Sequence, residues 1–488
     1  MRRWACALWL LMGLAPGLAP AGAPPKALTL TDCAAGAYVA RCGTFVVYED
    51  RAAHAGRTLA LPLVILPARH PGGRAIFYNP GGPGASAVDF AALIAEGAFA
   101  RELRQLRETY DIVLVDNRGI GGAGAQACEL FPPAHPEYYF LQLWPDEPLR
   151  ACRARLAAGA DLSLYTSSLA ADDLDDLRDA LGYRRIVLDG ASYGTHFYLV
   201  YMQRHPERVE SAILDGVAPP GLLIVPLEDA AGAQLALDQL VAACRADAQC
   251  QAHFPHFAEH FAELVRRFDA GPLRVRILNP VSKQPQEVLL SREVFSDRLR
   301  QTLYGPTSAA YVPYVIERAY LGDYLPLGQL IDATTHNMDL AVKAGANLSV
   351  TCAEELPFIT EEAVHASSAG SFEGDARVRA QQRACRIWNV RPVPESLGRP
   401  VHSDAPVLMV SGTDDPTSPA RFGTLALRYL PNAKQVLVQG AAHVTETDCT
   451  DHLKVAFVLA GSARELDTDS CSGAFHRPPF ATSMAGFL

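Results

Sequence analysis

The chain has 488 residues, 49% of them hydrophobic, and a mean hydropathy of +0.05. It can therefore bury a large core, which excludes intrinsic disorder, and its length suits one large domain with an insertion or two domains. The formal net charge of −10, without a dense basic patch, excludes nucleic acid as a partner because phosphate binding needs a basic face.

The N-terminus has the features of an export signal. Two arginines precede a short apolar run, and the small residues Ala19-Pro20-Ala21 follow it. The run is too short to span a bilayer, so we predict a signal peptide over residues 1–21 and a mature chain that begins at Gly22. The protein is then exported, to the periplasm or the medium. Without a later long apolar stretch, no integral membrane association is expected.

Short apolar runs alternate with helical stretches along much of the chain. The runs are continuously apolar, which is typical of strands buried on both faces of a parallel sheet. Strands that alternate with helices predict an α/β fold with a doubly wound sheet, which binds ligands beyond the C-terminal ends of its strands. The predicted strands are 75–78, 112–115, 186–188, 212–214, 407–410 and 436–438.

The first predicted strand is followed by a glycine-rich loop, Asn79-Pro80-Gly81-Gly82-Pro83-Gly84. Three glycines let backbone N–H groups approach a bound carbonyl closely, as an oxyanion hole requires. A simple turn is the alternative. A phosphate-binding loop is not expected, because the G-x-x-x-x-G-K-[ST] pattern is absent.

A G-x-S-x-G motif, Gly190-Ala191-Ser192-Tyr193-Gly194, follows the strand 186–188 and precedes a helical stretch over 195–204. In such a motif the serine lies exposed on a tight strand-to-helix turn, and the N–H of the next residue is an oxyanion donor. A glycine-rich turn that happens to contain a serine is the alternative. The strand and helix on either side favour Ser192 as a nucleophile, with the Tyr193 N–H as one donor.

The strand pattern largely stops between residues 221 and 399, where helices dominate. We therefore predict a core over 22–220 and 400–488, with an inserted, mainly helical cap over 221–399. The predicted cap helices are 227–247, 256–268, 292–303, 308–321 and 326–344.

Within the cap, His256, Glu259 and His260 fit the H-x-x-E-H pattern of a zinc peptidase. A third ligand is not identifiable, and phenylalanines at helical spacing explain the segment as the packed face of a helix. We therefore expect no metal, and no other cofactor is implied.

An acid and a base follow the last two predicted strands. Asp414 and Asp415 follow the strand 407–410, and His443 follows the strand 436–438. Two consecutive strand-end loops can bring an acid and a histidine to a serine, in the chain order of this kind of hydrolase. Asp414, Asp415 and Asp215, which follows an earlier strand, all remain candidates for the acid on this reasoning.

Ten cysteines remain once the predicted signal peptide is removed. An even number in an exported chain indicates disulfides, although sequence alone does not fix their connectivity. The cysteines form five neighbouring pairs, which we predict to be the bridges: Cys33–Cys42, Cys128–Cys152, Cys244–Cys250, Cys352–Cys385 and Cys449–Cys471.

Taken together, these motifs resemble the prolyl and tripeptidyl aminopeptidases of the α/β-hydrolase superfamily over nearly the whole mature chain. The loop 80–84 resembles the HGGPG motif of that family, with Pro80 in place of the histidine of prolyl aminopeptidases, as in the tripeptidyl branch. This likeness implies that the Gly82 N–H is the second oxyanion donor. Residues 412–416 resemble G-T-x-D-P, which implies Asp415 as the acid. Residues 116–121 resemble D-x-R-G-x-G, a structural motif.

The resemblance also suggests how the substrate binds. Residues 351–355 resemble a C-x-[DE] motif of the cap, and related peptidases use cap acids to bind the α-ammonium group of the substrate. Glu354 is the first candidate for this anchor and Glu355 the second; a solvated or capping glutamate is the alternative.

The resulting prediction is an exported serine hydrolase with an α/β-hydrolase fold and a triad of Ser192, Asp415 and His443. It releases residues or short peptides from free N-termini through an acyl-enzyme. The alternatives are a carboxylesterase with the same triad, which would act on a small ester, and a non-catalytic binding protein on this fold.

Overall fold

The computed structural model describes residues 26–221, 225–394 and 399–487. The signal peptide expected over residues 1–21 lies outside the described residues.

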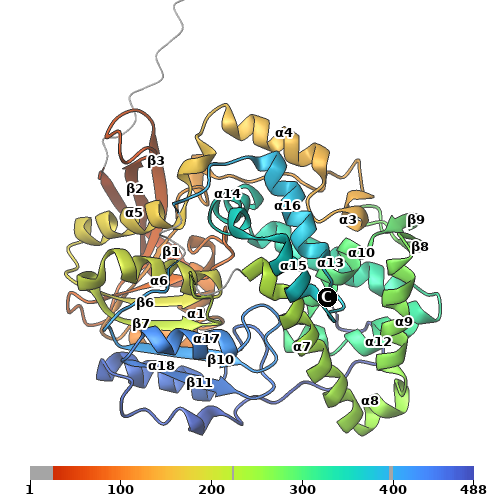
Figure 1. Ribbon diagram of the computed structural model, residues 1–488. Helices are drawn as coiled ribbons and strands as arrows, with labels where there is room; N and C mark the ends of the chain where they lie inside the picture. The colour runs from red at the N-terminus through yellow and green to blue at the C-terminus, as the bar shows by residue number, and fades with distance from the viewer. Residues whose placement is uncertain (1–25, 222–224, 395–398, 488) are drawn as a thin grey trace, which may run out of the picture.

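The centre of the molecule is a sheet of nine strands in the order β1-β2-β3-β5-β4-β6-β7-β10-β11 (Figure 1). The six strands from β5 to β11 are parallel, and β1, β2 and β3 add an antiparallel edge. The strands are β1 (Leu28–Ala35), β2 (Tyr38–Tyr48), β3 (Thr58–Leu66), β4 (Ala75–Asn79), β5 (Asp111–Val115), β6 (Ile186–Ala191), β7 (Val209–Asp215), β10 (Val407–Gly412) and β11 (Ala433–Val438).

The sequence predicted all six parallel strands, because each carries a continuous apolar run. These runs are buried except in the edge strand β11, where Leu437 is exposed. Every residue of β4, β6 and β10 is buried. The antiparallel edge was not predicted. In β1 buried and exposed residues are mixed, so this strand carries no continuous apolar run.

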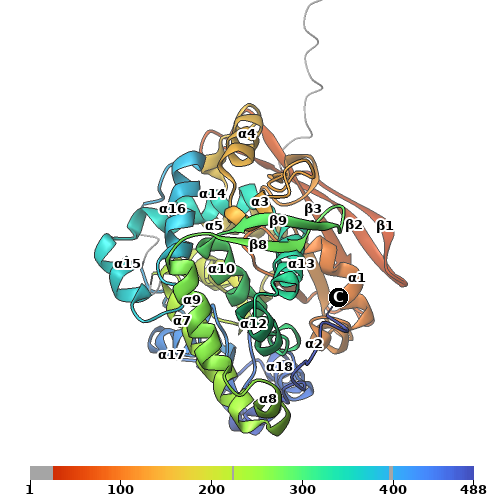
Figure 2. The same ribbon diagram turned by 90° about the vertical axis from the view of Figure 1, so that its right-hand side faces the viewer.

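Helices cover both faces of the sheet, as a doubly wound fold requires. The core on one face includes Leu174 and Phe197, and the core on the other includes Leu103 and Phe457. Helices α2 and α18 pack together on this second face (Figure 2). The first face is covered by α5 (Ser167–Ala180), α6 (Tyr193–Arg204) and α17 (Arg421–Ala426), the second by α1 (Ala91–Glu96), α2 (Arg101–Leu106) and α18 (Asp448–Ala460).

The chain between β7 and β10 forms a second, mainly helical body, drawn in green and cyan in Figure 1, around its own apolar core. It also contains an antiparallel hairpin of β8 (Leu273–Leu278) and β9 (Pro285–Leu290), which the sequence analysis did not predict. Its helices are α7 (Val225–Ala246), α8 (Ala248–His253), α9 (Phe257–Asp269), α10 (Arg292–Thr302), α11 (Pro306–Ala309), α12 (Val312–Tyr320), α13 (Leu325–Ala341), α14 (Ala344–Glu354), α15 (Glu361–Ser368) and α16 (Ala376–Trp388).

Two helices from the first half of the chain join this helical body. They are α3 (Tyr138–Leu141) and α4 (Asp146–Ala157). Phe140 of α3 belongs to the apolar core of the helical body, and Leu149 of α4 packs with Trp388 of α16.

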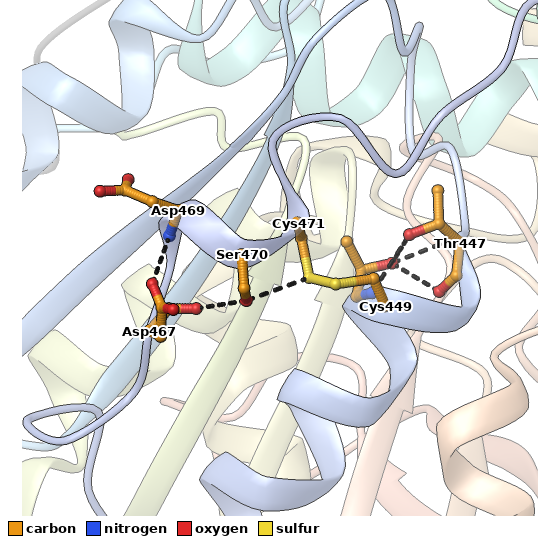
Figure 3. Close-up of a disulfide and its surroundings, with 7 residues drawn as sticks. Thr447, Cys449, Asp467, Asp469, Ser470 and Cys471 are labelled. Atoms are coloured by element: carbon orange, nitrogen blue, oxygen red, sulfur yellow. Dashed lines mark hydrogen bonds between the residues drawn. A yellow bond between two sulfur atoms is a disulfide. The ribbon is translucent and has the colours of Figure 1, made fainter.

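Disulfides join the five pairs of cysteines that neighbour each other in the sequence. Two of them lie close to the residues of interest below. Cys352–Cys385 ties α14 to α16. Cys449–Cys471 ties the first turn of α18 to the chain near the C-terminus, as Figure 3 shows, and so steadies the segment that leads from His443 into α18.

Candidate active site

Ser192 lies at the sharp turn between β6 and α6. Its backbone has φ 56° and ψ −127°, a strained conformation for a residue with a side chain. The turn is held because the Ser192 N–H donates to the Asp215 carbonyl at 2.8 Å. A Cβ on Gly190 would lie 2.7 Å from the carbonyl carbon of Gly194, and a Cβ on Gly194 would collide with the Asn79 carbonyl oxygen. Both glycines of the motif are therefore sterically required.

The glycine-rich loop after β4 passes directly over this turn. A Cβ on Gly81 would lie 2.5 Å from the Ala191 carbonyl oxygen and 2.9 Å from the Tyr193 nitrogen. The Gly81 N–H donates to Asn79 Oδ1 at 2.9 Å, which fixes the start of the loop. Gly82 and Tyr193 line one cavity of about 460 Å³ together with Ser192. Both residues thus belong to the wall around the serine, where oxyanion donors have to be.

Asp415 and His443 form a buried pair at the C-terminal ends of β10 and β11. His443 Nδ1 lies 2.8 Å from Asp415 Oδ2. The other carboxylate oxygen accepts the N–H groups of Thr417 at 2.9 Å and Ser418 at 2.8 Å. His443 lines the same cavity as Ser192. The three predicted triad residues therefore come together at the edge of the sheet where strand-end loops meet.

The contact between Asp415 and His443 shifts the pKa of both residues. Burial raises the pKa of Asp415, but the charge and hydrogen bond of His443 and the N–H groups of Ser418 and Thr417 bring that pKa below its ordinary value. Burial lowers the pKa of His443, and the charge of Asp415 outweighs it, so that the pKa is raised. An imidazolium is thus stabilised at this position, as a general base requires when it takes a proton.

The other two candidates for the acid have different partners. Asp414 Oδ2 accepts a hydrogen bond from Arg477 at 2.6 Å. Asp215 Oδ2 pairs with Lys454 at 2.9 Å. Of the three aspartates, only Asp415 has a hydrogen bond to His443 among those of the described residues.

The two glutamates proposed as the amine anchor have different environments. Glu354 accepts the N–H and the hydroxyl of Ser167, both at 2.6 Å, and does not line the cavity. Glu355 lines the cavity, and no hydrogen bond among the described residues reaches its carboxylate. Burial raises the pKa of Glu355 to about 7, with His196 opposing the rise and Glu354 adding to it. The structure thus favours the second candidate over the first.

Two residues that contact the acid or the base were not predicted from the sequence, Ser418 and Tyr304. Ser418 donates its hydroxyl to Asp415 Oδ2 at 2.7 Å and lies 3.1 Å from His443 Nδ1. The ring of Tyr304, at the end of α10, lies 5.0 Å from the ring of His443. The position of Ser418 three residues after Asp415, typical of a turn that caps a carboxylate, is the only signal in the sequence that could have indicated it.

The H-x-x-E-H and D-x-R-G-x-G motifs of the sequence lie in packed, hydrogen-bonded surroundings away from Ser192. His260 bonds to Glu317 at 2.6 Å and stacks on Tyr320, while the phenylalanines of α9 are buried. No group of three or more His, Cys, Asp or Glu side chains among the described residues is arranged to hold a metal ion. In the D-x-R-G-x-G motif, Arg118 forms a buried pair with Asp173 of α5 at 2.7 Å.

The chain is similar to one protein family and to several known enzymes. The family described as alpha/beta hydrolase fold matches residues 74–445. Serine protease Hip1 of Mycobacterium tuberculosis is 25% identical over 469 residues, which are 87% of this chain and 86% of that protein. Carboxylesterase B of the same organism is 27% identical over 473 residues, 87% of this chain and 85% of that protein. Tripeptidyl aminopeptidase of Streptomyces lividans is 28% identical over 221 residues, 42% of this chain and 40% of that protein.

A search of the described helices for a stretch that could cross a bilayer finds none.

Proposed function

Because the chain belongs to the α/β-hydrolase family, we propose that it is an exported serine hydrolase that removes residues or short peptides from free N-termini. Ser192 is the nucleophile, His443 the general base and Asp415 the acid that orients it. The pair at 2.8 Å between His443 Nδ1 and Asp415 supports this assignment, since it leaves Nε2 of the ring free to accept a proton.

In the proposed reaction, Ser192 Oγ attacks the scissile carbonyl and His443 takes the hydroxyl proton. The N–H groups of Tyr193 and Gly82 donate to the negative oxygen that forms. The C–N bond breaks, His443 returns its proton to the departing amine, and the acyl group stays on Ser192. Water then attacks the acyl-enzyme by the same route and releases the acid.

The preference for a free N-terminus rests on Glu355. It is a carboxylate on the wall of the cavity that contains Ser192, without a hydrogen-bond partner among the described residues. Glu355 is half-buried, and a carboxylate that is partly removed from water gains from a ligand that supplies the partner. The α-ammonium group of a peptide supplies both a charge and hydrogen-bond donors.

A carboxylesterase is the second candidate. The same triad and oxyanion donors hydrolyse esters, and the similarity to carboxylesterase B extends over 87% of this chain. Export is supported by the five disulfides, because such bridges form in oxidising compartments.

A set of chromogenic substrates separates these possibilities. Aminoacyl, dipeptidyl and tripeptidyl anilides are compared with their N-acetylated forms and with simple esters. We expect at least one free-amine anilide to be cleaved about 100-fold better than its acetylated form, and Ser192→Ala to abolish hydrolysis. Equal cleavage of free and blocked anilides would exclude the aminopeptidase and leave the esterase.

The matched variants are Glu355→Gln and Glu362→Gln, the second on an exposed position of α15. The first should remove the preference for free amines and keep the hydrolysis of blocked esters, whereas the second should change neither.

A further inference from the structure

One part of the wall of the active-site cavity is apolar and comes from segments that sequence motifs did not indicate. Phe90 follows the glycine-rich loop, Phe99 precedes α2, and Val444 directly follows His443. All three line the cavity that contains Ser192, and none is fully buried. Half-buried aromatic side chains on a cavity wall are typical of a binding surface.

These three residues lie on the His443 side of the cavity. The rings of Phe90 and Phe99 are 4.9 Å apart. The N–H of Ala100, next to Phe99, donates to Glu446 Oε1 at 2.6 Å. Glu446 belongs to the segment between β11 and α18 that also carries His443 and Val444. The two phenylalanines are thereby tied to the loop of the general base.

Val444 has a backbone conformation that is unusual for its side chain. Its φ is 49°, in the left-handed region, where a β-branched residue is strained and glycine is not. Its Cγ2 would lie 3.2 Å from a Cβ on Gly216, which also lines the cavity, so the two residues pack closely in the cavity wall. A valine held in this conformation next to the general base indicates that its side chain serves the cavity.

Apart from His443, the ionisable groups of the cavity come from other elements. Asp229 is on α7, Arg300 on α10 and Arg377 on α16, while His196 is on α6 and Glu355 directly follows α14. The cavity thus combines ionisable residues of these elements with the apolar residues Phe90, Phe99 and Val444.

We propose that Phe90, Phe99 and Val444 form the subsite for the residue immediately after the scissile bond, and that this subsite takes an aromatic or branched aliphatic side chain. The reason is chemical: the general base must reach the departing amine to protonate it, so the leaving part of the substrate lies beside His443. This inference rests on the serine-hydrolase mechanism proposed above, but not on the identity of the amine anchor.

The first test varies only the leaving residue. Peptides that share one N-terminal part carry Phe, Leu, Gly or Asp after the scissile bond. We expect kcat/KM to be at least 10-fold higher for Phe and Leu than for Gly, and lowest for Asp, because a hydrophobic pocket discriminates by about that factor per apolar group. Equal rates for Phe and Gly would overturn the proposal.

The variants Phe99→Ala and Val444→Gly each remove part of the apolar wall. Each should lower kcat/KM at least 5-fold for Phe-leaving peptides and change it less than 2-fold for Gly-leaving peptides. Val444→Gly also relieves the unfavourable φ, so it keeps the test valid if the other variant folds poorly. Leu459→Ala, an exposed position of α18, is the matched control and should change neither rate. An equal loss for both peptides would contradict the assignment.

A second test is independent of the amine anchor. An ester substrate generates the acyl-enzyme, and phenylalaninamide, leucinamide or glycinamide is added. The amine nitrogen attacks the acyl carbonyl, a C–N bond forms, and Ser192 Oγ leaves with the proton that His443 removed from the amine. We expect phenylalaninamide to capture at least 5-fold more acyl group than glycinamide, and Phe99→Ala to abolish the difference. Equal capture would overturn the subsite, whereas a failed aminopeptidase assay would not affect this result.

Discussion

At the scale of single residues, the acidity of His443 decides the pH at which the proposed reaction runs. The imidazole has to be neutral to accept the proton of Ser192. Burial alone would keep it neutral to a lower pH, but the charge of Asp415 at 2.8 Å outweighs burial and raises the pKa of His443. Asp415 therefore strengthens the base and, in the same act, moves the onset of activity to higher pH.

We predict that kcat/KM for an N-blocked ester rises with pH along an acid limb whose apparent pKa lies above 6.5, the ordinary value for histidine. Asp415→Asn removes the charge that raises the pKa of His443, so the acid limb should move to lower pH. The maximal rate should fall by roughly 10⁴-fold, because the imidazole ring of His443 is no longer oriented. Initial rates between pH 5 and 9 check this. If the acid limb of the wild-type profile has an apparent pKa at or below 6.5, Asp415 does not raise the pKa of His443.

Two adjacent glutamates illustrate why neighbouring residues can differ in role. Glu354 ends α14 and is held by Ser167, whose hydroxyl also lies 2.7 Å from the hydroxyl of Tyr193. Glu355 is the next residue, where the backbone leaves the helix with φ −120° and ψ −60°. Because the backbone changes direction here, the Glu354 carboxylate bonds to Ser167 near the turn of the nucleophile, whereas Glu355 lines the cavity.

The pKa of about 7 for Glu355 predicts a pH-dependent affinity for free-amine substrates. Below that pH the carboxyl is protonated and attracts an ammonium group less, and above about pH 8 the peptide amine itself is neutral. The reciprocal of KM should therefore peak between these two values. In Glu355→Gln we expect KM to rise by about 10- to 100-fold and the acid limb of this profile to disappear. An unchanged KM for the unblocked anilide would rule out Glu355 as the anchor.

At the scale of elements, the helical body is connected directly to the loop that carries the acid. The Thr417 hydroxyl, two residues after Asp415, donates to Asp229 of α7 at 2.8 Å. Arg300 of α10 bonds to the same aspartate oxygen at 3.3 Å and to the Tyr304 hydroxyl at 2.6 Å. Thr417, Asp229 and Arg300 are buried, and hydrogen bonds between buried groups are stronger and a missing partner is costly. The geometry of Asp415 is thus set from two sides, by the sheet and by the helical body.

Replacing Thr417 with valine removes the hydroxyl and keeps the shape of the side chain. We predict that Thr417→Val lowers the free energy of unfolding by about 1–2 kcal/mol, since it deletes one hydrogen bond to a charged group. We also expect kcat to fall by about 2- to 10-fold with little change in KM. Denaturant unfolding and steady-state kinetics check both. Thr424→Val, an exposed position of α17, is the control and should stay within about 0.5 kcal/mol.

The same scale shows which elements the sequence could predict. The parallel strands and the turn at Ser192 were predictable, because continuous burial and a tight turn leave strong local patterns. The helix predicted over 326–344 ends at Ala341 in the structure, because Val342 pairs with Ala85, the residue after the glycine-rich loop. That end depends on a contact between residues far apart in the chain. Which of Glu354 and Glu355 lines the cavity depends in the same way on where α14 ends. Local sequence patterns define neither the end of α13 nor the end of α14.

At the scale of the whole molecule, several buried carboxyl groups make stability depend on pH. Burial raises the pKa of Glu446 and Glu355 to about 7 and that of Asp116 and Asp451 to about 6. A carboxyl group whose pKa is higher in the folded than in the unfolded chain stabilises the fold below the unfolded value. That stabilisation is lost as pH rises through the folded value. The raised pKa of His443 acts in the same direction.

We therefore predict that Tm falls as the pH is raised from about 5 to about 8. Glu446→Gln removes one of these groups and keeps an acceptor for the N–H of Ala100, which donates to Glu446 at 2.6 Å. The variant should raise Tm at pH 8 by roughly 1–3 °C, which corresponds to about 1–3 kcal/mol in a protein of this length, and leave it nearly unchanged at pH 5. Glu362→Gln, exposed on α15, is the matched control. Calorimetric scans across this range check the slope, and a Tm that rises from pH 5 to pH 8 would show that carboxylate pairing outweighs the burial of these groups.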